Sequence, residues 1–177
     1  NAGTPQNTKV TLKINFADGS YTDFQMYDIV VNVDYINVTI NQVFTTITSK
    51  GRICYNGTGQ AEGLGFTYNG ENLVYEAGML VGLNSNKVSD NVRAAAGAND
   101  NDFQSSQVVQ RLIPTVQSEF DLFGRFADNI APTPIPVSVG HKAFAWSTPG
   151  NDKFIIVEYR IKNTGATTLT NLDRKSV

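Results

Sequence analysis

The sequence predicts an all-β protein, an antiparallel β-sandwich with long loops. Apolar and polar residues alternate along several short segments, as they do in strands that bury one face. Turn residues, mainly glycine and asparagine, separate these segments at roughly 8–12-residue spacing, which is typical of sandwiches. No stretch longer than about ten residues carries a convincing helical period.

The N-terminal segment predicts a β-hairpin. Residues 9–16 alternate cleanly, and Asp18-Gly19 supplies a favoured turn. The apolar parity of the return strand shifts between Met26 and Ile29, which predicts a β-bulge. Because a lone hairpin is marginally stable in water, we expect residues 1–33 to be either the first hairpin of the main sheet or the tail of an upstream domain.

The middle of the chain predicts further strands in a main module of residues 34–177. Asn69-Gly70 lies between short apolar segments and predicts a second hairpin. Gly78 and Gly82 interrupt the next apolar run, where we expect a bulge or a close backbone approach. Residues 83–106 are polar and predict a long loop.

The last third predicts the clearest strands, at residues 137–146, 154–162 and 167–172. Residues 108–113 are ambiguous, and we favour a strand there. The segment 154–162 is the best core-strand candidate, because its apolar and charged residues lie on opposite faces: Ile155, Val157, Tyr159 and Ile161 on one, and Glu158, Arg160 and Lys162 on the other.

Composition narrows the classes of function. The net charge is −2 and no basic block occurs, which argues against a nucleic-acid-binding protein. No apolar run approaches the roughly 20 residues of a membrane-spanning helix. The single cysteine, Cys54, is expected as a small buried hydrophobe in a strand.

Residues able to carry chemistry are few. His141, the one histidine, lies in a predicted strand, and no Gly-x-Ser-x-Gly motif accompanies it. Glu76 is flanked by apolar residues, but a single buried carboxylate does not make an acid/base pair. We therefore expect no enzyme. Asp100 and Asp102 are calcium candidates, although their segment lacks the EF-hand glycine and closing glutamate, so an ordinary polar loop is the competing interpretation.

Four aromatic residues could form a platform on which a sugar stacks: Trp146, Tyr68, Tyr75 and Phe123. Packing in the core is the alternative for each of them.

Several motifs cover most of the chain from about residue 34: residues 48–53, 66–70, 73–82, 87–93, 100–103, 141–146 and 154–159. Together they resemble a module of large secreted Bacteroidetes proteins. These proteins are type IX secretion substrates that frequently carry subtilisin-like (S8) protease domains or adhesin repeats elsewhere. Cys54 stands where that module is expected to have glycine.

The resemblance implies a non-catalytic structural or adhesive module of a secreted or cell-surface protein. It also implies that residues 1–33 are the last strands of an Ig-like domain. An accessory domain of a subtilisin-like protease and a carbohydrate-binding module are the alternatives. The expected partners are other domains of a larger parent chain, or neighbouring chains that pair strands with this one, and a glycan.

Overall fold

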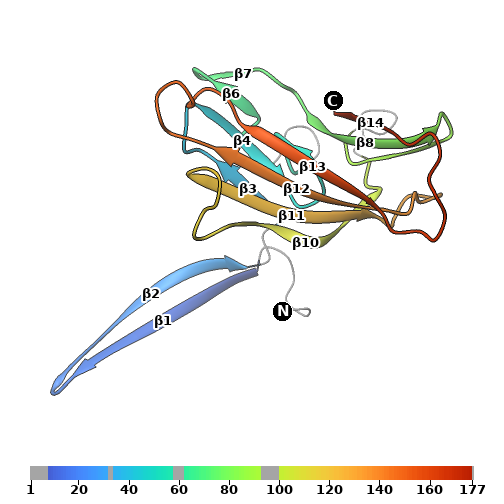
Figure 1. Ribbon diagram of the computed structural model, residues 1–177. Coiled ribbons are helices and arrows are strands. Elements are labelled where there is room, and N and C mark those ends of the chain that lie inside the picture. The colour runs from blue at the N-terminus through green and yellow to red at the C-terminus, as the bar shows by residue number, and fades with distance from the viewer. Residues whose placement is uncertain (1–7, 32–33, 58–61, 93–99, 177) are drawn as a thin grey trace. The chain divides into compact units, whose positions relative to one another are not determined.

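The computed structural model describes residues 8–31, 34–57, 62–92 and 100–176. The chain forms two compact units, a hairpin unit (Asn1–Asp34) and a sandwich unit (Tyr35–Val177). Every regular element in the described ranges is a β-strand, and the strand pairs are antiparallel (Figure 1). The all-β prediction is confirmed. None of the described segments forms a helix long and apolar enough to cross a membrane.

The hairpin unit pairs β1 (Thr8–Asp18) with β2 (Tyr21–Val31) around the predicted Asp18-Gly19 turn. The predicted bulge between Met26 and Ile29 is wrong, because the register runs without a shift from end to end. The change of parity instead places apolar side chains of β2 on both faces of the hairpin, since successive residues of a strand point to opposite sides.

One face of the hairpin is largely apolar. Opposed residues in the register share a face, which places Leu12 beside Tyr27. The hairpin is a single layer, so this face is exposed at Val10, Leu12, Ile14, Phe16, Tyr21, Tyr27 and Ile29. On the other face, Lys9 forms an ion pair with Asp28 at 3.5 Å, and Lys13 lies over the ring of Phe24.

The sandwich unit contains two sheets. The four-stranded sheet follows chain order: β10 (Phe103–Arg111), β11 (Phe120–Asp128), β12 (Val137–Ala145) and β13 (Ile156–Asn163). The eight-stranded sheet has the order β14 (Asp173–Ser176), β8 (Ala77–Asn84), β5 (Arg52–Ile53), β4 (Val43–Thr48), β6 (Phe66–Tyr68) and β7 (Glu71–Asn72), with β3 (Tyr35–Val38) beside β4 and β9 (Lys87–Asp90) beside β8.

The core lies between these two sheets. One buried cluster joins Met79 and Val81 of β8 to residues of the four-stranded sheet, including Phe126 and Val139. A second joins Val38 and Ile47 to residues that include Val109 and Leu122. Both clusters draw side chains from both sheets, so the sheets pack face to face in the manner of a sandwich (Figure 1).

The predicted turns have clear outcomes. The second hairpin is confirmed, and Asn69 and Gly70 both have positive φ, at 51° and 82°, as its tight turn requires. The side chain of Val92 approaches the backbone of Gly78 closely, since a Cβ at Gly78 would lie 2.6 Å from Cγ2 of Val92. A register shift follows between Gly82 and Asn84.

Three predictions of local structure need correction. The polar region 83–106 contains β9 and the start of β10, while residues 93–99 lie outside the described residues. The sequence pattern did not predict β9, because Ser89 and Asp90 are buried by hydrogen bonding and not as part of an apolar face. The predicted strand at 167–172 is absent, and β14 follows it instead. Cys54 is buried but lies just after β5, with a left-handed φ of 82°.

The core makes a stability test possible with one residue type. Val139 is fully buried, whereas Val116 is 78% exposed. We expect Val139→Ala to lower the free energy of unfolding by about 2 kcal/mol, since it removes two buried methyl groups and leaves a cavity. Val116→Ala should change it by less than about 0.5 kcal/mol. Urea denaturation measures both, and equal losses would contradict the assigned core.

Candidate functional site

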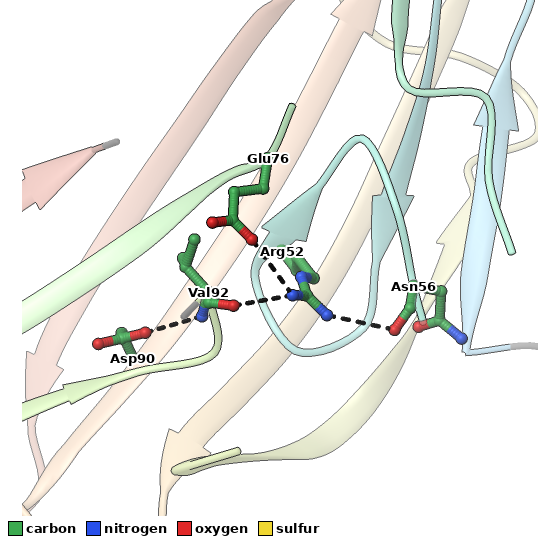
Figure 2. A network of polar contacts seen from close by, with 5 residues as sticks. All are labelled: Arg52, Asn56, Glu76, Asp90 and Val92. Carbon is green, nitrogen blue, oxygen red and sulfur yellow. Dashed lines mark hydrogen bonds and ion pairs between the residues drawn. The ribbon is translucent and has the colours of Figure 1, made fainter. Parts of the chain in front are cut away.

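A buried arginine organises polar contacts between three segments of the eight-stranded sheet (Figure 2). Arg52 is 6% exposed. Its guanidinium donates to the carbonyl oxygen of Val92 at 2.8 Å and to that of Asn56 at 3.5 Å. Its Nη2 lies 3.7 Å from Oε2 of Glu76. Asp90 completes the network by accepting the backbone N–H of Val92 at 2.7 Å.

The electrostatics of this network are those of a structural ion pair. Burial lowers the pKa of Arg52, and the carboxylates of Glu76 and Asp90 oppose that shift. Glu76 thus lies beside an arginine, with which its carboxylate forms an ion pair. The arrangement fixes backbone around β5, β8 and β9, because the guanidinium ties carbonyl groups from separate segments.

The two most nucleophilic side chains are enclosed. Cys54 is fully buried, and burial raises the pKa of its thiol to about 11, so it is a neutral thiol near pH 7. His141 is 2% exposed and lies on the inward face of β12. Its ring stacks on Tyr159 and meets the edge of Phe126, at centroid distances of 6.4 and 5.3 Å. Burial lowers the pKa of His141 to about 4.

Two buried aspartates of β11 hold loop backbone. Asp121 accepts the backbone N–H groups of Val116, Gln117 and Ser118 at 2.6–2.8 Å. Burial opposes its ionisation, but these hydrogen bonds outweigh burial and hold the pKa of Asp121 below its usual range. Asp128 accepts the hydroxyl of Ser89 at 2.5 Å and the N–H of Ile135 at 2.6 Å, linking the two sheets.

The calcium candidates lie at the start of β10. Asp102 is 7% exposed and accepts the backbone N–H of Asp90 at 3.1 Å. Burial raises the pKa of Asp102 to about 6, and the nearby carboxylates of Asp100, Asp128 and Asp90 raise it further. Within the described ranges, no group of three or more His, Cys, Asp or Glu side chains is placed to hold a metal ion. The calcium site remains a prediction.

The predicted sugar platform is spread over both sheets. Trp146 follows β12, is half-buried and packs on Phe154, with ring centroids 5.9 Å apart. Tyr68 is half-buried in β6, and Tyr75 is 54% exposed after β7. Phe123 lies elsewhere, on the outward face of β11, where it lines a groove that the sequence pattern does not predict.

This groove is a shallow hollow of about 380 Å³ on the outward face of β11, β12 and β13. Its residues form rows across the three strands, because opposed residues share a face: Arg125, Gly140 and Arg160 form the central row. Gly140 forms the floor. The lining is Phe123, Arg125, Ser138, Gly140, Lys142, Glu158, Arg160, Lys162 and Thr164.

The fold and its surface define an all-β module of the sandwich type. The sequence matches no protein-family model, and neither the curated proteins nor the solved structures contain a significant match.

The single histidine gives a direct test of its burial. We expect the NMR titration of His141 to show a pKa of about 4 in the folded protein and about 6.5 in urea, since desolvation disfavours the imidazolium. The folded pKa is the lower one, so the stability that His141 contributes is complete above pH 6.5. It is lost as the pH falls towards 4, by about 3 kcal/mol. A folded pKa near 6.5 would show that His141 reaches solvent.

The structural role of Arg52 can be tested against an exposed arginine. Arg52→Met should lower the free energy of unfolding by about 3 kcal/mol, because it removes the buried donor to two carbonyl groups and the cation beside Glu76. Arg160, whose side chain is 74% exposed, pairs with Glu158 at 2.7 Å, and Arg160→Met should change stability by less than about 1 kcal/mol. Thermal or urea denaturation compares the two variants. Comparable losses would refute the assigned role.

Proposed function

We propose that the chain is a non-catalytic structural or adhesive module of a secreted or cell-surface protein. The observation that carries this proposal is a separation of roles in the sandwich unit. The buried ionisable side chains hold backbone or fill the core, as Arg52, Asp121 and His141 do. Charged side chains that point outward, such as Arg125, Arg160 and Lys162, line the groove on the outward face of β11–β13. The resemblance to secreted modules supports the location.

The geometry of the reactive groups supports the absence of catalysis. A catalytic acid, base or nucleophile must reach the substrate, and its pKa is normally tuned towards the working pH. Burial shifts the pKa values of Cys54 and His141 away from neutrality, to about 11 and about 4. Both side chains are also closed off from solvent.

The hairpin unit supports a structural role. In the described part of the chain, β1 and β2 pair with each other and with no third strand. A two-stranded sheet is marginal in water, and an open edge is a template for pairing. We propose that a β-strand of a neighbouring domain or chain pairs with this hairpin and that the partner's sheet covers its apolar face.

Carbohydrate binding is the second candidate, and the groove favours it. The groove combines an aromatic side chain, Phe123, with hydroxyl and charged groups, which is the chemistry that orients a polyhydroxylated ligand. No specific contact favours the accessory role beside a protease, so that alternative rests on the resemblance alone.

The proposal predicts binding without turnover. Incubated with peptide, ester and glycoside substrates, the purified chain should release no product, while labelled protein applied to a glycan array or to extracellular-matrix proteins should be retained. Mass spectrometry of the recovered substrates and fluorescence of the array measure the two outcomes. Substrate turnover that His141→Gln or Glu76→Gln abolishes would refute the proposal.

A further inference from the structure

The outward groove concentrates positive charge. Arginine or lysine accounts for four of its nine lining residues, and Glu158 is the one carboxylate among them. Arg160 donates its Nε–H to Glu158 at 2.7 Å, yet its side chain remains 74% exposed. The whole chain carries a net charge of −2, so the groove reverses the sign of the charge locally. Such a surface attracts anions.

Gly140 makes the surface concave between two arginines. Arg125 and Arg160 stand directly opposite it on the neighbouring strands, so their backbones are roughly 10 Å apart, twice the spacing between strands. Neither packing nor backbone conformation requires glycine here. An added Cβ would lie 3.8 Å from Cε2 of Phe123, an ordinary contact, and the φ of Gly140 is not in the left-handed region. The missing side chain leaves room for a ligand.

We propose that this groove binds an acidic oligosaccharide, with a carboxylate or sulfate group held between Arg125 and Arg160 over Gly140. The guanidinium fork matches such planar or tetrahedral oxyanions. Ser138 and Thr164 supply hydroxyl groups, and Glu158 supplies an acceptor, for the hydroxyls of the sugar. This inference deepens the adhesive form of the proposed function and rests on it.

The geometry favours a saccharide over a peptide. From Ser138 to Phe144, β12 pairs with a strand on each side, so the floor of the groove offers no strand edge to an added peptide. The free edge of the sheet lies at the margin of the groove, along β13, so recognition over Gly140 must come from side chains. A sugar acid presents its charge and hydroxyl groups around the rim of its rings, which suits such a surface.

The geometry also favours a saccharide over a nucleic acid. The basic patch is small within an acidic chain, whereas nucleic-acid binding requires an extended basic surface.

Calorimetric titration of the full chain tests the inference with three probes: an oligogalacturonate, a keratan sulfate oligosaccharide, which carries sulfate but no carboxylate, and a methyl-esterified oligogalacturonate that lacks the charge. We expect at least one of the two charged probes to bind, the esterified one not to bind, and added salt to weaken binding. The first two probes separate a carboxylate ligand from a sulfate ligand.

Two variants challenge the groove in different ways. Gly140→Val fills the floor without removing a charge, and Arg160→Gln removes a charge without filling the floor. Each should weaken binding about tenfold or more. Lys87→Gln makes the same charge change in β9 of the other sheet and should bind as the unmodified chain does. Matching thermal melts confirm that the variants fold.

Several results would overturn the inference: no binding of either charged saccharide, unchanged affinity in Gly140→Val, or stronger binding to single-stranded DNA or to a poly-glutamate peptide. Mass spectrometry of the recovered saccharide keeps the two proposals separate. A cleaved saccharide would refute the non-catalytic function, but the binding site in the groove would still be supported if Gly140→Val weakened binding. If the saccharide stays intact and does not bind, the binding site in the groove is refuted and the non-catalytic function is not.

Discussion

The packing of aromatic rings over glycines in the core is the constraint on which the sandwich unit depends: Phe126 packs over Gly51 across the two sheets, and His141 packs over Gly124 within the four-stranded sheet. A Cβ at Gly51 would lie 2.4 Å from Cζ of Phe126, and one at Gly124 would lie 2.3 Å from Nε2 of His141. The two rings therefore occupy space that a side chain at either glycine would fill. Arg52 follows Gly51 directly, and its guanidinium is buried where it meets Val92, Asn56 and Glu76.

The inward packing of β11–β13 determines what the outward face can be. In each strand, alternate side chains enter the core, and the others form a surface that the fold does not otherwise use. The strand register, rather than the distance along the sequence, decides which outward side chains lie side by side across the three strands. Arg125 and Arg160 are brought to the same hollow because each is opposed to Gly140.

Strands in which apolar and polar side chains alternate were predictable, and the strand that depends on polar burial was not. Residues 9–16 alternate and lie in β1, although their apolar face is exposed, and all but the first two residues of 154–162 lie in β13. The strand β9 was missed because hydrogen bonds, not apolar contacts, bury Ser89 and Asp90. The groove was hidden for another reason. Arg160 is typical of a solvated strand face when taken alone, and only the strand register places it opposite Gly140.

Cys54 has a left-handed φ of 82°, a backbone conformation that glycine adopts without strain. A side chain there costs roughly 1–2 kcal/mol in backbone conformation, and the burial of the small thiol offsets part of that cost. Bulkier or β-branched residues would bear the same strain in a fully enclosed position. Position 54 should therefore accept only small residues, and homologues of this module should carry cysteine, alanine or glycine there.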